Sequence, residues 1–222
     1  KVFHTVTSTD PETDIKALLD GIEPGIVGLR AMSHFKPQFD DLARLVRGAR
    51  PEAMIIGGGP YPSASYEQLL QEKIIDLAVI NEGERTFNQL IARLQGEWVL
   101  PLDINGTAVL EDGIVKLNSP RAVIDDLDTL EYPDYSLLDM DGYTGIFSQS
   151  HQEVAKSAFI CATRGCPFLC KYCHLAFGKK IRRRSADNIV AEMEEQYRRR
   201  DIRDFVFVDD IFNSPVRETK EL

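Results

Sequence analysis

The chain has 222 residues, of which 43% are hydrophobic and 27% charged, a composition typical of a globular protein with one large domain or two small ones. The net charge of −9 argues against nucleic acid as the main partner, because phosphate binding requires a basic face. No apolar run approaches the ~20 residues of a membrane span. No signal peptide opens the sequence. The four cysteines, three of them clustered, favour a reducing compartment over a secreted disulfide scaffold, so we expect a cytoplasmic protein.

The first hundred residues alternate between short apolar runs and amphipathic stretches. The apolar runs predict three strands, at 25–29, 53–56 and 75–80. Apolar residues at helical spacing predict three helices, which include 39–46, 66–70 and 86–94. Strands that alternate with helices predict a parallel sheet with helices on its faces. Ligands bind beyond the carboxyl ends of such strands, where the glycine run 57–59 and the loop 81–84 both lie.

The sequence changes character after residue 97. Asn105-Gly106 and Asp112-Gly113 are turn signals that predict a β-hairpin. The stretch 125–143, which is rich in acidic residues and tyrosine and contains Pro133, is predicted to be an ordered connector. Beyond it we expect a βαβ unit with strands at 158–162 and 205–208 and a helix capped by Ser185. The predicted divisions are therefore 1–97, 98–154 and 155–222. The basic runs 179–184 and 198–200 read as solvated helix surface.

Three of the four cysteines crowd into eight residues: Cys166, Cys170 and Cys173. Clustered cysteines favour a metal or redox site over a disulfide scaffold, and we expect Cys161 to be a buried strand thiol. A compact loop with this spacing can turn three thiolates toward one face of a 4Fe-4S cubane, which leaves one iron open. The alternative is structural zinc with His174 as fourth ligand, although adjacent residues rarely both face one tetrahedral metal.

This cysteine motif resembles that of the radical S-adenosylmethionine superfamily. The resemblance implies that the open iron binds S-adenosylmethionine, whose reductive cleavage yields a 5′-deoxyadenosyl radical, and that Tyr172 lies near the adenine. Asp209 and Asp210 stand where the family receives the amino group of the cofactor, in place of the commoner glycine-glycine-glutamate. Which aspartate takes that role stays open, and the alternative is that the pair caps the turn after the strand. The family's partial barrel has several βα units, so we expect a piece of a longer enzyme that does not turn over alone.

The front half resembles the cobalamin-binding domain of one radical subclass, through Ile26-Val27-Gly28-Leu29, the run 56–60 and the loop 81–84. The residues that this implies for cobalamin are Gly57, Gly58, Gly59, Glu82 and Gly83. Small residues would let a flat corrin ring approach the backbone. The Asp-x-His-x-x-Gly motif is absent, so we expect cobalamin without histidine ligation. Residues 1–4 resemble the second strand of such a domain, with the first strand missing. An ordinary flavodoxin-like domain without ligand is the alternative.

The expected fold is therefore α/β, with a Rossmann/flavodoxin-like cobalamin-binding domain, a linker, and the first βα units of a radical S-adenosylmethionine partial TIM barrel. The resemblance implies methyl transfer or oxidative cyclisation at an unactivated carbon, as in anaerobic magnesium-protoporphyrin IX monomethyl ester cyclases. The implied partners are a small-molecule substrate, such as a tetrapyrrole or another natural product, and an electron donor such as flavodoxin or ferredoxin. Two alternatives remain: a non-catalytic corrinoid sensor with a structural metal loop, and a radical enzyme whose front domain no longer binds cobalamin.

Overall fold

A computed structural model describes residues 1–94, 99–140, 157–173 and 176–212 of the chain. The chain divides into two compact units, and each is described by itself. The front unit comprises Asp10–Val123 and Cys170–Phe177. The rear unit comprises Lys1–Thr9, Ile124–Leu169 and Gly178–Leu222. No helix within the described ranges is long and apolar enough to cross a membrane.

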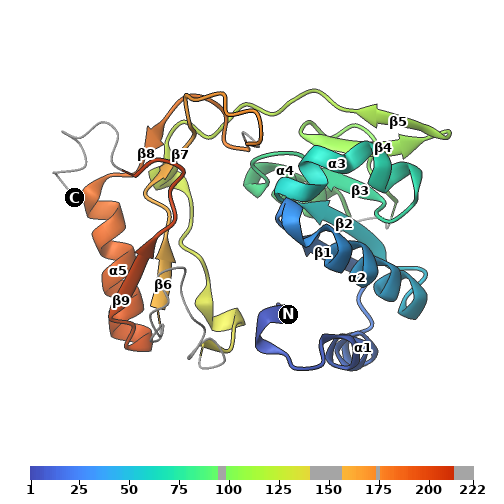
Figure 1. Cartoon of the computed structure of the whole chain (residues 1–222), viewed down its shortest axis with the longest axis horizontal. Helices are drawn as coiled ribbons and strands as arrows, with labels where there is room; N and C mark the ends of the chain where they lie inside the picture. Colours follow the sequence, from blue (N-terminus) through green and yellow to red (C-terminus); the bar gives the residue numbers. More distant parts are fainter. Residues whose placement is uncertain (95–98, 141–156, 174–175, 213–222) are drawn as a thin grey trace. The chain divides into compact units, whose positions relative to one another are not determined.

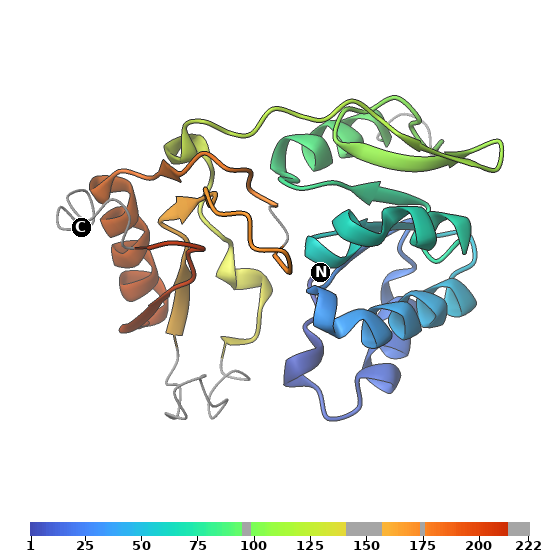
Figure 2. The same ribbon diagram turned by 45° about the horizontal axis from the view of Figure 1, so that its top comes forward.

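The front unit is built on a five-stranded sheet in the order β1-β2-β3-β4-β5 (Figure 1). Strands β1 (Ile26–Arg30), β2 (Met54–Gly58) and β3 (Leu77–Val79) are parallel, as the alternating pattern predicts. The hairpin of β4 (Thr107–Glu111) and β5 (Ile114–Leu117) pairs antiparallel with β3, and Figure 2 shows it at the edge of the sheet. The predicted hairpin is therefore confirmed, and it continues the sheet of the front unit beyond residue 97.

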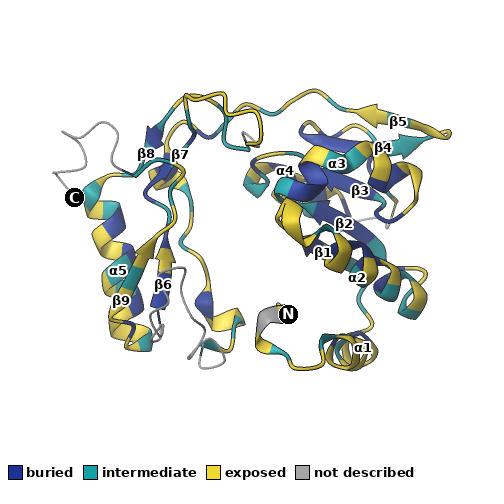
Figure 3. Cartoon of the chain, viewed as in Figure 1, coloured by how far each residue is buried: buried dark blue, intermediate teal, exposed yellow. Residues whose placement is uncertain are grey.

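Four helices accompany this sheet: α1 (Pro11–Ile22), α2 (Lys36–Ala49), α3 (Pro60–Gln71) and α4 (Glu84–Leu94). Helix α1 was not expected from the sequence, although Asp10 caps it by accepting a hydrogen bond from the Thr13 N–H. A 3-10 turn, Ser33–Phe35, precedes α2. Strand β3 and the middle of β2 are dark blue in Figure 3 because they are buried on both faces, which explains their continuous apolar runs. The core between them and α4 comprises Ile56, Leu77, Val79, Leu90, Leu94, Ile104 and Val109.

The rear unit contains the predicted βαβ unit. Strands β6 (Ser157–Ile160) and β9 (Asp204–Phe207) pair in parallel, and α5 (Ala186–Arg200) joins them. Ser185 caps α5 as predicted, because its side chain accepts from the Asn188 N–H at 3.2 Å. Two short strands, β7 (Thr163–Arg164) and β8 (Arg182–Arg183), pair antiparallel. Three 3-10 turns complete the unit, at Thr5–Thr7, Leu127–Thr129 and Tyr135–Leu137.

Two sequence expectations are wrong in this unit. Residues 1–4 form no strand, and the half-exposed Val2 gives them no buried face to pair against a sheet. Residues 179–184 are not a solvated helix. Arg182 is 3% exposed and donates to the Ile124 carbonyl at 2.6 Å, while Arg184 forms a buried ion pair with Glu192 at 2.5 Å. The run 198–200 does lie in the last turn of α5, with Arg198 and Arg199 exposed.

A polar cluster joins the first turns of α2 and α3 in the front unit. Asp40 and Tyr61 are 7% and 2% exposed, and the Tyr61 hydroxyl donates to Asp40 at 2.9 Å. The Lys36 ammonium donates to both Asp40 and Tyr61, at 2.8 and 2.7 Å. Burial raises the pKa of Tyr61, so the phenol stays protonated and keeps its donor. This cluster fixes the start of α3 against α2.

Removal of the buried hydroxyl by Tyr61→Phe is expected to lower the free energy of unfolding by about 1–3 kcal/mol, because the buried Asp40 loses a donor. Urea denaturation followed by circular dichroism measures the change. Tyr66→Phe is the matched control on the same helix, since the Tyr66 hydroxyl donates to the exposed Glu67, at 3.3 Å, and to no other residue that the structure describes. Equal stability of the two variants would contradict the assigned role of the cluster.

Candidate functional site

The carboxyl ends of β1, β2 and β3 lie at one edge of the front sheet, because the three strands are parallel. Hydrogen bonds join the loops that leave this edge. The Tyr61 N–H donates to the Ala31 carbonyl at 3.1 Å, which links the loops after β1 and β2. The buried Ser63 donates to the Val79 carbonyl at 3.4 Å and accepts from the Asn81 N–H at 3.0 Å, which links the loops after β2 and β3. The structure therefore brings the two predicted ligand-binding loops together.

Three of the predicted cobalamin glycines have a reason in the fold itself. A Cβ on Gly57 would lie 2.9 Å from Ile75 Cδ1 and 3.1 Å from Pro62 Cβ, so packing requires glycine there. Gly59 has φ +84°, and a Cβ would lie 2.8 Å from Arg30 Cγ. A Cβ on Gly83 would lie 3.3 Å from Val79 Cγ1. Glu82, which directly precedes Gly83 in the loop after β3, is 8% exposed.

Gly58 differs from these residues. It is the last residue of β2, its φ is not positive, and no described atom lies within 4 Å of a Cβ built on it. Neither a turn nor a close neighbour therefore requires glycine at this position. Open space above a glycine at the carboxyl edge is what the close approach of a flat ligand needs.

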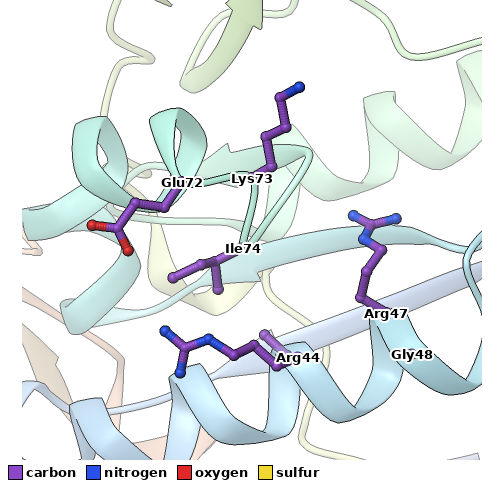
Figure 4. A pocket seen from close by; sticks show the side chains of 7 residues that line it. Arg44, Arg47, Gly48, Glu72, Lys73 and Ile74 are labelled. Atoms are coloured by element: carbon purple, nitrogen blue, oxygen red, sulfur yellow. The ribbon is translucent and has the colours of Figure 1, made fainter.

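A pocket of about 360 Å³ lies elsewhere on the front unit (Figure 4). Its lining comes from the second half of α2 and from the turn between α3 and β3: Ala43, Arg44, Arg47, Gly48, Glu72, Lys73 and Ile74. These segments precede β2 and β3, so the pocket lies toward the amino ends of the strands. Arg47 is held by Asp76 at 2.6 Å and by the Ala53 carbonyl at 2.9 Å. The pocket is therefore separate from the predicted ligand-binding edge.

Strand pairing and close backbone contacts fix the base of the cysteine loop within the rear unit. Here the cysteine loop means residues 165–181, and its base is the β7–β8 pair, in which Thr163 faces Arg183 and Arg164 faces Arg182. Gly165 has φ +95°, and a Cβ on it would lie 2.2 Å from the Lys180 carbonyl oxygen. The Cys166 N–H donates to the Gly178 carbonyl at 3.1 Å. Only glycine fits at Gly165, which the sequence analysis did not single out.

The predicted cluster ligands differ in exposure. Cys166, in the rear unit, is partly buried, whereas Cys170 and Cys173, counted with the front unit, are exposed. The Cys173 N–H donates to the Cys170 carbonyl at 3.0 Å, so these two residues share a tight turn. Tyr172 between them is 93% exposed. Among the described residues, no three His, Cys, Asp or Glu side chains lie together as a metal-binding group, and His174 lies outside those residues.

Cys161 is set apart from these three cysteines. It follows β6 directly, is partly buried, and its thiol donates to the Thr163 carbonyl at 3.3 Å. Burial raises the pKa of the Cys161 thiol, and the nearby Asp209 raises it further. A thiol of this kind is a poor nucleophile and a poor metal ligand, because both roles need the thiolate.

The two aspartates after β9 differ in their surroundings. Oδ1 of Asp209 accepts from the Thr163 N–H and lies 2.5 Å from the Thr163 hydroxyl. Asp210 is exposed, and no hydrogen bond to a described residue is seen for its carboxylate. Desolvation, followed by the negative charge of Asp209, raises the pKa of Asp210. Asp209 is therefore engaged within the fold, whereas Asp210 is accessible to a ligand.

Comparison with known proteins bears on the front of the chain first. Residues 2–91 match the family described as "B12 binding domain". The front of this chain is therefore similar to B12-binding domains. Within the matched residues lie β1, β2 and β3 and the loops at their carboxyl edge.

Relatives extend the likeness past this domain and confirm the resemblance found from the sequence. The chain is 29% identical over 90% of its length to an uncharacterized methyltransferase of Pyrococcus horikoshii, of which it spans 42%. It is 27% identical over 83% of its length to the anaerobic magnesium-protoporphyrin IX monomethyl ester cyclase of Synechocystis, of which it spans 36%. The fold resembles that of a radical S-adenosylmethionine methyltransferase, TsrM, from Kitasatospora setae, with a TM-score of 0.72, 17% identity, and coverage of 96% of this chain and 42% of that one. The chain thus spans less than half of each.

Substitution of Gly165 by alanine is expected to open the base of the cysteine loop, because the new Cβ would overlap the Lys180 carbonyl. Hydrogen exchange at the Cys166 N–H should become at least about tenfold faster, which corresponds to a loss of about 1.4 kcal/mol in the local opening free energy. Gly113→Ala is the matched control, because Gly113 also has a positive φ but no described atom lies within 4 Å of its Cβ position. If exchange at Cys166 were unchanged in Gly165→Ala, the close approach would not hold the loop.

Proposed function

We propose that this chain is the cobalamin-binding and cluster-binding part of a cytoplasmic radical S-adenosylmethionine enzyme that transfers a methyl group to an unactivated carbon of a small molecule. In this proposal residues 1–97 form the cobalamin domain and residues 155–222 begin the radical domain. The observation that carries it is Gly58, an open glycine at the carboxyl edge of a B12-binding domain. The activity belongs to the longer protein, since the chain spans only part of its relatives.

The donor groups fit the proposed cofactors. At the carboxyl edge, Gly58 leaves room for a corrin ring, and the glycines on either side of it are held by packing and by a positive φ. In the cysteine loop, two exposed thiols follow a partly buried one, and three thiolates leave one iron of a 4Fe-4S cluster open. The absence of an Asp-x-His-x-x-Gly motif supports cobalamin without a histidine ligand.

The cofactors supply radical and methyl chemistry when bound, while the chain supplies position and electrostatics. Cys166, Cys170 and Cys173 would ligate the cluster, and Tyr172 would lie against the adenine. Asp210 would accept a hydrogen bond from the amino group of S-adenosylmethionine, because it is the exposed carboxylate of the pair. An external donor such as flavodoxin or ferredoxin would supply the electron.

Methyl transfer is favoured over cyclisation by the names of the relatives. The Pyrococcus relative is named a methyltransferase and matches 90% of the chain, whereas the cyclase matches 83%. Oxidative cyclisation, with a tetrapyrrole as the substrate, is the second candidate, because the cyclase is 27% identical over that match. In the longer protein, a labelled methyl group of S-adenosylmethionine that appears in the product would support methyl transfer, whereas an oxidised product without label would support cyclisation.

The cluster assignment predicts that each of three alanine variants, at Cys166, Cys170 and Cys173, binds much less iron and sulfide than the unaltered chain after anaerobic reconstitution. Cys161→Ala is the matched control and should keep the full iron content, because this thiol is partly buried, its pKa is raised by burial, and it is hydrogen-bonded to the Thr163 carbonyl. Iron, sulfide and zinc per chain are measured together. Stoichiometric zinc without iron or sulfide would contradict the cluster and support a structural metal loop.

The cobalamin assignment predicts that Gly58→Val keeps the fold but weakens cobalamin binding at least about tenfold, equivalent to 1.4 kcal/mol, because the added side chain enters the open space at the carboxyl edge. Spectral titration with cobalamin measures the affinity, and urea denaturation measures stability. Gly57→Val should instead lose about 1–3 kcal/mol of stability by overpacking. Gly48→Val, on α2 beside the separate pocket, should change neither property. Absence of any cobalamin binding by the unaltered chain would indicate a front domain that no longer binds it.

A further inference from the structure

Strands β6 and β9 end side by side in the rear unit. They are parallel neighbours, with Phe159 opposite Val206 and Ile160 opposite Phe207. One more hydrogen bond continues the ladder, from the Val208 N–H to the Ile160 carbonyl at 2.9 Å. The chain segments that leave the two strands therefore start together, one toward the cysteine loop and the other toward the aspartate pair, as Figure 1 shows.

Asp209 and Thr163 meet at this point, although they are 46 residues apart in sequence. The Thr163 side chain is 1% exposed. Its hydroxyl lies 2.5 Å from Asp209 Oδ1 and 3.2 Å from the Ile211 carbonyl oxygen, and the Thr163 N–H also donates to Oδ1. One hydroxyl proton can serve only one acceptor, and the shorter distance assigns it to the carboxylate. A single carboxylate oxygen thus accepts two hydrogen bonds from one residue.

Thr163 opens the base of the cysteine loop. It is the first residue of β7, and the next two residues are Arg164, which pairs with Arg182, and Gly165, which packs against the Lys180 carbonyl. A displacement of Thr163 would therefore shift the backbone that carries Cys166. On the other side, Asp209 follows β9 by two residues and is held in place by the β6–β9 ladder.

The second carboxylate oxygen of Asp209, Oδ2, lies in different surroundings from Oδ1. Oδ2 is buried and has no hydrogen-bond partner among the residues that the structure describes. A buried carboxylate oxygen without a partner costs free energy, so the retained contacts of Oδ1 must compensate for it. A solvated turn cap would not need such burial, and an exposed carboxylate such as Asp210 does not have it.

We propose that Asp209 is a positioning residue that holds the base of the cysteine loop against the end of β9 through Thr163. This inference rests on the proposed function only for its consequence, which is that Cys166 is presented at a fixed place for cluster assembly. Asp209 itself touches neither cluster nor substrate in this proposal. The two aspartates thus have different roles: Asp209 orders the cysteine loop, and Asp210 faces the ligand.

The test compares hydrogen exchange at the Thr163 and Cys166 amides in the 222-residue chain and its variants, without any cofactor. Asp209→Ala should raise exchange at both amides at least about tenfold, and Asp209→Asn should raise it less, because the amide oxygen still accepts. Asp204→Ala, at the exposed start of β9, is the control and should change neither amide. Asp210→Ala should also leave both amides unchanged. Unchanged exchange in Asp209→Ala, or an equal increase in Asp210→Ala, would overturn the proposal.

A second pair of variants keeps the proposal testable if Asp209→Ala does not fold. Thr163→Val removes the hydroxyl and keeps the backbone donor, so it should raise exchange at Cys166, whereas Thr163→Ser should restore the exchange rate of the unaltered chain. Equal rates in these two variants would overturn the proposal.

Iron content after anaerobic reconstitution then distinguishes the positioning role of Asp209 from the proposed function of the chain. Faster exchange together with a chain that never binds iron would retain the Asp209 contact and reject the proposed function, whereas faster exchange with lowered iron supports both.

Discussion

Parallel pairing of adjacent strands is the constraint on which both units of this protein depend. A parallel pair needs a crossover that returns the chain to the amino edge, so all the carboxyl ends gather at the opposite edge. In the front unit this gathers the loops after β1, β2 and β3, and Ser63 ties two of them together. In the rear unit the same constraint brings the ends of β6 and β9 together, where Thr163 meets Asp209. Each candidate ligand site begins where a parallel strand ends.

The sequence predicted the elements whose signal is local. Strands β2 and β3 are buried on both faces, so they appear as unbroken apolar runs, and Ser185 marks the start of α5 by its own side chain. Helix α1 has an equally local signal, an aspartate cap followed by proline, and could have been predicted from it. The strand expected at residues 1–4 is wrong, because it was expected from the resemblance to a cobalamin-binding domain, and four residues do not reveal whether a neighbouring strand is present to pair with them.

The candidate site was predictable as a set of loops but not residue by residue. Three consecutive glycines look alike in the sequence, and only long-range neighbours separate them: Ile75 and Pro62 explain Gly57, and a turn explains Gly59. Neither a close neighbour nor a turn explains the glycine at Gly58. The adjacent aspartates are alike in the same way, and a threonine 46 residues away distinguishes them. Local pattern identifies the kind of residue, whereas contacts distant in sequence assign its role.

Directional polar contacts position the base of the cysteine loop in the rear unit. Buried apolar residues, such as Ala158 and Ile202 in one cluster and Ile160 and Ile189 in another, form part of its described core. Arg184 contacts Glu192, Asn188 and the Cys161 carbonyl, and Arg182 reaches the Ile124 carbonyl. Buried charges carry a desolvation penalty and contribute little net stability, but they tolerate few alternative geometries. The base of the cysteine loop is therefore set by hydrogen-bond geometry, and its position should be more sensitive to loss of a polar partner than to small changes in apolar volume.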